Sequence, residues 1–353
     1  MKKKNIIYLM PEIKLASGGA KVIYNHSSIL NNLDNDKISS KIVHLKKKLS
    51  YKIETSLSKR INLFNKRYSG WDVKKMKVSQ KFLPNKKWHN EDITLGKNLN
   101  FNKNSDFIIL PEIWAHFAVD LGLIKQKIKY AIFVQGFYHM NTTNNYKKIK
   151  SAYKNANIII TVSEYSLGYL REMFPTMKKK IFKINFSLNN KKIKIKKKKN
   201  LITYMPRKLA DHYNLLDFYL KDLLPKNWII VPLLNLSEKK LFQILGESKI
   251  FLSFSHLEGT GIPPIEAALS GNKVIGYTGG GGSEYWKKPI FTKIENGEIR
   301  NFGKEVLLSI KNYDINWVNK TKKHRTKLSY IYSAKLEKKS LINLSKEILK
   351  IFT

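Results

Sequence analysis

The sequence predicts an α/β protein with two parallel sheets, and two observations support this. Short apolar runs rich in β-branched and aromatic residues alternate with helix-length segments along the 353-residue chain. Such alternation is typical of β-α-β units in a parallel sheet. It stops at an almost wholly basic stretch, residues 189–200, and resumes after it. Because a chain of this length commonly forms about two domains, we expect one sheet on each side of that stretch.

The first domain is expected to end at residue 188. Residues 18–33 carry apolar side chains on one face and predict a helix. Residues 46–104 break the alternation, since they are polar and basic with scattered aromatic side chains. We interpret them as an insertion or as elaborated loops on the first domain. The strands expected around these segments cover residues 5–10, 41–45, 107–110, 130–134 and 157–162.

The basic stretch 189–200, "NNKKIKIKKKKN", is consistent with a nucleic-acid-binding tail or with a solvated linker. The linker is favoured because strands are expected on both sides. The second domain is expected to span residues 201–327. A C-terminal helix should follow over 328–353, where apolar residues recur at helical spacing. The strands expected in the second domain cover residues 201–205, 228–231, 250–254 and 273–277.

The charge and composition exclude several classes of protein. Lys and Arg number 66 against 26 Asp and Glu, a net charge of +40. A coding bias toward lysine accounts for much of this, and attraction to phosphates, acidic lipids or nucleic acid is the alternative. The chain has no cysteine, so disulfides and thiolate chemistry are excluded. No apolar run reaches the roughly 18–20 residues of a membrane-spanning helix, and we expect a cytoplasmic protein.

The densest chemical signal covers residues 253–286. A strand is expected to end at Phe254, followed by a loop with His256, Glu258 and the glycines of "EGTG". A helix should start at Pro263 or Pro264 and hold Glu266 in its first turn. Ligands of open α/β sheets bind at such carboxyl ends of strands, and exposed N–H groups favour phosphate. The next strand ends in the glycines 279–282, a second loop rich in exposed backbone.

The spacing of Glu258 and Glu266, with Gly259 and Gly261 between them and "GNKVIGYTGGGGSEY" downstream, resembles the family 4 retaining glycosyltransferases of the GT-B fold. The resemblance implies two Rossmann-like parallel-sheet domains facing a cleft, with the C-terminal helix crossing back to the first domain. It implies that Glu258 holds the donor sugar and acts in catalysis. Glu266 would hold the ribose, with the backbone at Gly259, Gly261 and Gly280 close to the donor.

Weaker elements match the same family. Gly18 and Gly19 follow the first strand, where such enzymes place a loop near the donor's phosphates; a plain turn is the alternative. Arg207 would hold the diphosphate, and a surface ion pair is its alternative. The family's later Lys is absent, so Lys208 or His212 would replace it. Gln135 stands where many relatives have a sugar-contacting His, and His139 is nearby. Pro111 and Glu112, which follow Leu110, are candidates for lining the acceptor side.

The resemblance therefore implies transfer of a sugar from a nucleotide diphosphate sugar to the hydroxyl of a glycan, a lipid-linked glycan or a surface polysaccharide, with retention. We expect no metal, because no metal-ligand spacing is evident, and no cofactor apart from the donor substrate. Arg207, Lys208 and backbone N–H groups would stabilise the departing diphosphate.

Two other functions stay open at this point. A nucleic-acid-binding protein would explain the charge but not the two spaced glutamates, so nucleic acid is not an expected partner. A catalytically inactive relative would keep the fold and bind nucleotide sugars. A further hypothesis is peripheral attachment to the inner face of an anionic membrane through residues 46–104, at the headgroup level.

Overall fold

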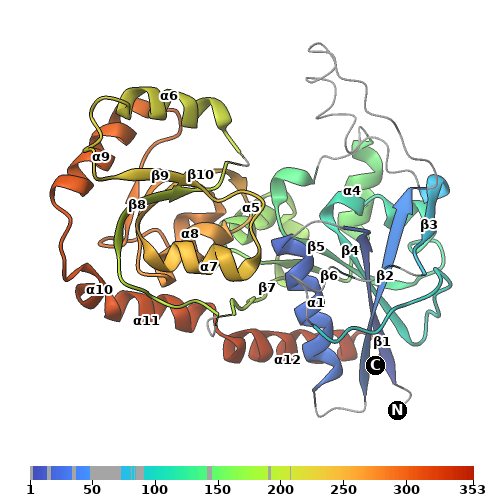
Figure 1. Ribbon diagram of the computed structural model, residues 1–353. Helices are drawn as coiled ribbons and strands as arrows, with labels where there is room; N and C mark the ends of the chain where they lie inside the picture. The colour runs from blue at the N-terminus through green and yellow to red at the C-terminus, as the bar shows by residue number, and fades with distance from the viewer. Residues whose placement is uncertain are drawn as a thin grey trace. The chain divides into compact units, whose positions relative to one another are not determined.

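The structure, a computed structural model, describes residues 3–13, 17–33, 37–47, 73–80, 82, 84, 91–140, 145–189, 192–206 and 208–353. The chain divides into two compact units, whose elements are labelled in Figure 1. Unit 1 comprises residues 1–162, 166–184 and 338–353; unit 2 comprises residues 163–165 and 185–337. Each unit contains one sheet, so the predicted fold class is confirmed.

The sheet of unit 1 has seven strands in the order β3-β2-β1-β4-β5-β6-β7. All neighbours pair in parallel except β2 and β3. The two short strands β3 and β7 were not expected, because three residues give no recognisable pattern. The strands are β1 (Lys4–Pro11), β2 (Ile38–Lys47), β3 (Met76–Val78), β4 (Asp106–Pro111), β5 (Lys129–Val134), β6 (Ile158–Thr161) and β7 (Ile181–Lys183).

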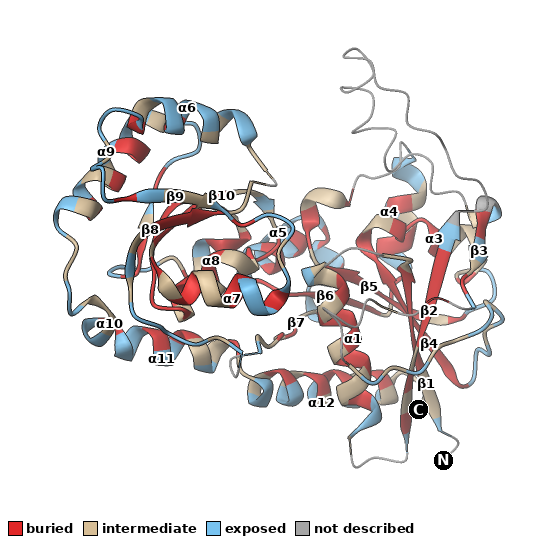
Figure 2. Cartoon of the chain, viewed as in Figure 1, coloured by how far each residue is buried: buried red, intermediate tan, exposed pale blue. Residues whose placement is uncertain are grey.

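Continuous apolar runs form the centre of this sheet because both of its faces are covered. All six residues of β4 are buried, and Figure 2 shows the buried strands in red. Ser17 and Asn145 cap the first turns of α1 and α4 through their side-chain oxygens. The helices of the unit are α1 (Gly18–Asn31), α3 (Phe117–Asp120), α4 (Tyr146–Asn155) and α5 (Glu164–Met173), with short 3₁₀ turns η1 (Val73–Lys75), η2 (Glu112–Trp114), η3 (Phe137–His139) and η4 (Pro175–Lys180).

The expected insertion at 46–104 lies largely outside the described residues. Its first two residues belong to β2, which continues to Lys47 rather than ending at residue 45. The reason is that β3 pairs antiparallel with the end of β2, where Leu45 faces Val78.

The sheet of unit 2 has five parallel strands in the order β12-β11-β10-β8-β9. Strand β12 is again a three-residue edge strand that the sequence pattern missed. The strands are β8 (Lys199–Tyr204), β9 (Ile229–Pro232), β10 (Ser248–Glu258), β11 (Lys273–Gly280) and β12 (Phe291–Lys293). The helices are α6 (Ala210–Leu220), α7 (Glu238–Glu247), α8 (Ile262–Leu269), α9 (Ile299–Lys311), α10 (Trp317–Lys320) and α11 (Lys322–Ile331), and the 3₁₀ turn η5 is Gly281–Glu284. The last helix, α12 (Ala334–Lys350), starts in unit 2 and continues into unit 1.

The basic stretch before β8 is mostly exposed over its described part, and several of its lysines attach it to unit 2. The Lys198 ammonium donates to the carbonyls of Ser248 and Ser270 at 2.7 and 2.6 Å. These residues end α7 and α8, where the last carbonyls lack partners within the helix and attract cations. Lys192 also pairs with Glu238 at 2.5 Å. The lysines are therefore used to fix the segment on its own domain.

The C-terminal region is two helices and not one. Helix α11 ends at Ile331, and α12 starts at Ala334 after Ser333, whose hydroxyl accepts from the Leu336 N–H. This serine cap explains why the expected helix from residue 328 is interrupted. Residues 338–353 belong to unit 1, where Phe352 packs 4.5 Å from the Lys4 ammonium. The return of the terminal helix to the first domain agrees with the resemblance.

Strand β2 buries His44 completely in the core of unit 1. Its Nε2 lies 3.0 Å from the Tyr24 hydroxyl, and its ring packs 4.8 Å from that of Phe82. Burial lowers the pKa of His44 to about 4, although the charge of Glu12 opposes this. The imidazole is therefore neutral in the folded protein at neutral pH.

We predict that unit 1 loses stability as the pH falls from 7 to 5. The unfolded chain then protonates His44 near its ordinary pKa while the folded one does not, which costs about 2 kcal/mol. Urea unfolding, followed by hydrogen exchange of the β1 and β2 peptides, measures this. In His44→Phe the loss should shrink by that amount, and in His324→Gln, which alters an exposed histidine on α11, it should persist. An equal loss in both variants would contradict the prediction.

Candidate active site

Two clusters of the expected site residues lie at the carboxyl ends of parallel strands, one in each unit. In unit 2, β8 lies between β9 and β10, so the chain connections diverge at the junction of β8 and β10. Ligands of open α/β sheets bind at such a switch point. Lys208 follows β8, and Glu258 ends β10.

Lys208 and Glu258 form an ion pair at this switch point. The Lys208 ammonium donates to Glu258 Oε1 at 2.7 Å and to the His256 carbonyl at 2.8 Å. The two side chains are 31% and 23% exposed, so the pair is accessible to a ligand. Burial lowers the pKa of His256, and the charges of Lys208 and His212 add to the effect. His212 Nδ1 forms a hydrogen bond of 3.0 Å with the Tyr277 hydroxyl. His212 therefore lies beside His256 and Lys208 in the same cluster.

The expectation that the strand before the motif ends at Phe254 is wrong. Strand β10 continues to Glu258, which pairs with Gly280 of β11 after a register shift that begins at Ser255. Leu257 takes a positive φ of 50° within this bulge. A bulge redirects a side chain at the end of a strand, and here it fixes Glu258 to the sheet. The glutamate is thus more rigidly placed than a loop residue would be.

The two glycine segments predicted around Glu258 meet backbone to backbone. A Cβ added at Gly281 would lie 1.9 Å from the Gly259 carbonyl oxygen, so no side chain fits. Gly261 and Gly280 both take positive φ angles, 78° and 82°, which glycine adopts most easily. The Gly261 carbonyl accepts a hydrogen bond of 2.6 Å from the Tyr285 hydroxyl. The structure therefore brings Glu258, Gly259, Gly261 and Gly280 together.

Helix α8 starts one residue earlier than expected, at Ile262, with Gly261 as its cap. Pro263 and Pro264 occupy its second and third positions, so they offer no N–H groups to an anion. Glu266 is the fifth helical residue and lies in the second turn, not in the first as predicted. Its side chain is partly buried. The free amides at the start of this helix are therefore those of Gly261 and Ile262.

The second cluster lies in unit 1, where β1 is flanked by β2 and β4. Helix α1 begins at Gly18, and the Gln135 amide, just after β5, donates to the Gly19 carbonyl at 3.0 Å. A Cβ added at Gly19 would lie 2.7 Å from Gln135 Oε1. His139 lies on η3, and its ring carbon Cδ2 is 3.2 Å from a Cβ placed at Gly136. Gly18, Gly19, Gln135 and His139 are thus brought into one region.

Glu112 lies at the carboxyl end of β4, and the sequence did not predict its contacts with the turn after β5. Its carboxylate is buried and accepts the N–H groups of Gly136 and Gln135 at 3.0 and 3.3 Å. A carboxylate directly after the apolar run 107–111 was the available signal, because burying a carboxylate requires hydrogen-bond donors nearby. Lining the sugar-acceptor side, the role expected from the sequence, does not by itself explain these hydrogen bonds.

Two expectations stay open. Arg207 lies outside the described residues, so of Arg207 and Lys208, both expected to hold a diphosphate, the structure describes only Lys208. Among the described residues, no three or more His, Asp or Glu side chains are grouped to hold a metal.

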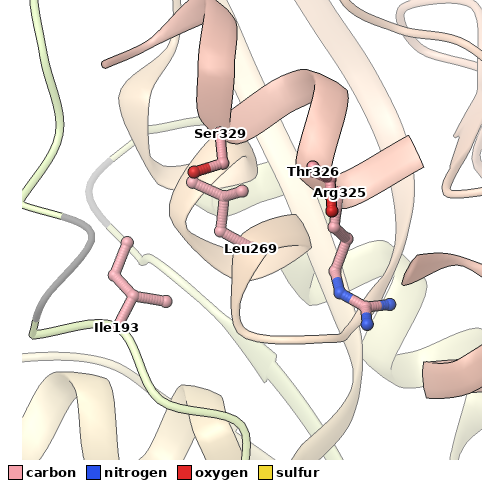
Figure 3. Close-up of a pocket in the computed structure, with 5 residues that line it drawn as sticks. All are labelled: Ile193, Leu269, Arg325, Thr326 and Ser329. Atoms are coloured by element: carbon pink, nitrogen blue, oxygen red, sulfur yellow. The ribbon is translucent and has the colours of Figure 1, made fainter. Parts of the chain in front are cut away.

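A pocket of about 240 Å³ lies elsewhere in unit 2, away from the Lys208–Glu258 pair. Figure 3 shows it between the basic stretch, the C-terminal end of α8 and α11, with Ile193, Leu269, Arg325, Thr326 and Ser329 around it. The Arg325 guanidinium is already used by Thr321 and by the Val318 carbonyl. Leu269 is at the far end of α8 from Gly261, so this pocket is separate from the switch point.

Comparison with known proteins shows the fold. No family model and no curated protein matches this sequence. The glycosyltransferase from Rickettsia africae is 16% identical with a TM-score of 0.63, covering 99% of this chain and 100% of that one. Staphylococcus aureus TarM is 13% identical with a TM-score of 0.61, covering 99% and 100%. The lipopolysaccharide outer core galactosyltransferase WaaB is 12% identical with a TM-score of 0.58, covering 98% and 99%. The chain therefore has the GT-B fold.

We predict that Gly281→Ala destabilises unit 2. The added methyl group overlaps the Gly259 carbonyl, and overpacking of this kind costs about 1–3 kcal/mol. Thermal unfolding measures the loss. Gly168→Ala is the matched control, because Gly168 lies on helix α5 with nothing within 4 Å of the added atom. It should be neutral or stabilising by up to about 1 kcal/mol. Equal melting temperatures for the two variants would disprove the close approach.

Proposed function

We propose that the protein is a glycosyltransferase that moves a sugar from a nucleotide diphosphate sugar to an acceptor hydroxyl, with retention. The observation that carries this is the Lys208–Glu258 pair beside two glycine turns at the switch point of unit 2. Structural neighbours lend support: a TarM mutant was solved with UDP and alpha-GlcNAc-glycerol, and the pneumococcal O-GlcNAc transferase GtfA with UDP and GlcNAc.

The chemical task in such a transfer is to stabilise charge as the diphosphate departs. In this proposal Arg207 and Lys208 face the diphosphate, and the amides at Gly18 and Gly19 add donors. Lys208 has three N–H donors, two of which serve Glu258 and the His256 carbonyl. The third is available for a phosphate oxygen. Lys208 can therefore hold the diphosphate and orient Glu258 with one side chain.

The carboxylates would recognise hydroxyl groups. Glu258, oriented by Lys208, would accept from the donor sugar, and Glu266 from the ribose. Gly259, Gly261 and Gly280 would let the backbone approach the donor because they have no side chains. Gln135 and His139 would contact the transferred sugar in unit 1. No metal or cofactor is part of the proposal.

The competing functions are less well supported. The described part of the basic stretch is attached to unit 2 through Lys192 and Lys198, so it is not a free tail, although most of its side chains are exposed. A catalytically inactive relative would retain the same site, and turnover separates it from an enzyme. Release of free nucleoside diphosphate, together with the anomeric configuration of the product by NMR, tests both transfer and retention.

We predict that a nucleotide sugar raises the melting temperature of the protein in the presence of EDTA, since a ligand of the folded state stabilises it. Glu266→Ala should then weaken that binding about tenfold or more by calorimetry, because buried hydroxyls lose their acceptor. The control is Glu295→Ala, which removes an exposed carboxylate of the same unit.

Equal affinity of the two variants for the nucleotide sugar would show that Glu266 does not contact the donor. If no nucleotide sugar binds and none is turned over, the proposed function itself is wrong. Binding that requires Mg²⁺ or Mn²⁺ would reject metal independence.

We also propose that the acceptor is presented at an anionic membrane, which the protein contacts peripherally. In the described residues no helix is long and apolar enough to cross a membrane. The surface first expected to bind, residues 46–104, lies mostly outside them. Unit 1 offers a described alternative on α4, where Tyr146 is 65% exposed and Lys147, Lys150 and Lys154 are exposed. Each lysine near an acidic surface contributes about 1 kcal/mol.

This proposal predicts sedimentation with acidic but not with neutral vesicles at physiological salt. Changing Lys147, Lys150 and Lys154 to Gln should reduce it at least tenfold, since about 3 kcal/mol is lost. Changing the exposed lysines of α11 in unit 2, Lys322, Lys323 and Lys327, removes the same charge elsewhere and should have little effect. Equal reductions would mean that the total charge, and not this surface, attracts the protein to lipid.

A further inference from the structure

The buried carboxylate of Glu112 connects three segments of unit 1 that are far apart in sequence. It follows β4 directly and is 6% exposed. Its two oxygens accept the N–H groups of Gln135 and Gly136, which form the turn after β5. The amide of Gln135 then reaches the Gly19 carbonyl at the start of α1. One carboxylate thus fixes the turn, and the turn fixes the helix start.

We propose that Glu112 is a positioning residue for the donor site, which holds Gln135 and the start of α1 in place through the turn after β5. The effect on activity that we expect from this role rests on the proposed function. The contacts on which it stands belong to unit 1 alone. Glu112 touches neither donor nor acceptor in this proposal, and it acts through Gln135 and Gly136.

The charge state of Glu112 decides how well it can hold the turn. As a carboxylate it accepts both N–H groups, whereas a protonated carboxyl has an O–H that must find an acceptor. Burial raises the pKa of Glu112 to about 7, although the hydrogen bonds from the backbone of Glu112, Gln135 and Gly136 oppose the rise.

Among the residues that the structure describes, His139 and Tyr153 are the titratable groups near Glu112. His139 on η3 lies near the same face of Gly136 as Glu112 Oε1, and Tyr153 of α4 is buried beside it, with a raised pKa caused by burial and by the charge of Glu112. Since a neutral carboxyl holds the turn less well, the turn should tighten as the pH rises through 7.

Glu112→Gln is the sharpest test, because the amide keeps the size of the side chain but turns one acceptor into a donor. That donor would face the N–H of Gln135 or Gly136. We expect the amides of this turn to exchange at least tenfold faster by hydrogen-exchange mass spectrometry. We expect kcat/KM for the donor to fall about tenfold to a hundredfold, with loss of the ionisation near pH 7 from its pH profile.

Asp106→Asn is the matched control. Asp106 is a buried carboxylate at the opposite end of the same strand, where it accepts from Asn5 and the Asn102 N–H. Its replacement should lower the melting temperature while leaving the exchange of the 135–136 turn and the pH profile unchanged. An ionisation that survives in Glu112→Gln would belong to another group, such as His139, and would overturn the proposal.

The experiments distinguish a failure of the proposed function from a failure of the positioning role of Glu112. If the wild type turns over no nucleotide sugar, the proposed function fails, but the exchange measurement still tests Glu112. If turnover is present and the turn exchanges equally fast in the wild type and in Glu112→Gln, the proposed function stands and the positioning role is wrong. Faster exchange of the turn in both Glu112→Gln and Asp106→Asn would show a general loss of stability and would likewise reject the role.

Discussion

A close approach of two backbone segments in unit 2 sets the geometry of the candidate site. Gly281 can lie against the Gly259 carbonyl only because Gly281 carries no side chain. This contact lets β11 stay paired with β10 through the bulge as far as Glu258 and Gly280. Glu258 then reaches Lys208 at the end of β8, and Gly261 begins α8. A larger residue at this contact would separate the strands at the point where the carboxylate, the ammonium and the helix start meet.

The large positive charge is used unevenly across the chain. Lys198 is half-buried and donates to the last carbonyls of two helices, so its charge serves the packing of unit 2. Lys208 stands at the switch point and pairs with Glu258. Lys147, Lys150 and Lys154 of α4 and the lysines of α11 are exposed and contribute to the electrostatic field around the protein. Net charge alone therefore could not distinguish a structural lysine from a binding one, and the nucleic-acid hypothesis arose from summing lysines whose roles differ.

The sequence was informative where pattern and geometry coincide. Buried parallel strands are nearly continuous apolar runs, so the long strands were placed within a few residues. The three-residue strands β3, β7 and β12 have too few positions to show a pattern. The motif around Glu258 predicted which residues meet but not that β10 extends through a bulge, because pairing with β11 decides that. Glu266 was placed one turn too early since the proline pair suggested a helix start, whereas Gly261 with its positive φ supplies the cap. The role of Glu112 depends on contacts with Gln135 and Gly136, more than 20 residues away, which no local pattern encodes.

Both units hold a carboxylate at the carboxyl end of a parallel strand, yet the two differ in burial and in hydrogen-bond partners. Glu258 is partly exposed and pairs with the ammonium of Lys208. Glu112 is buried and is held by neutral backbone donors, so its ionisation is penalised and its pKa rises to about 7. The exposed carboxylate suits direct recognition of hydroxyl groups, because a ligand can reach it. The buried one has both oxygens committed to backbone amides and suits the support of its neighbours. Burial and the choice of donor thus separate a carboxylate suited to binding from a carboxylate suited to positioning, although both stand at the carboxyl end of a parallel strand.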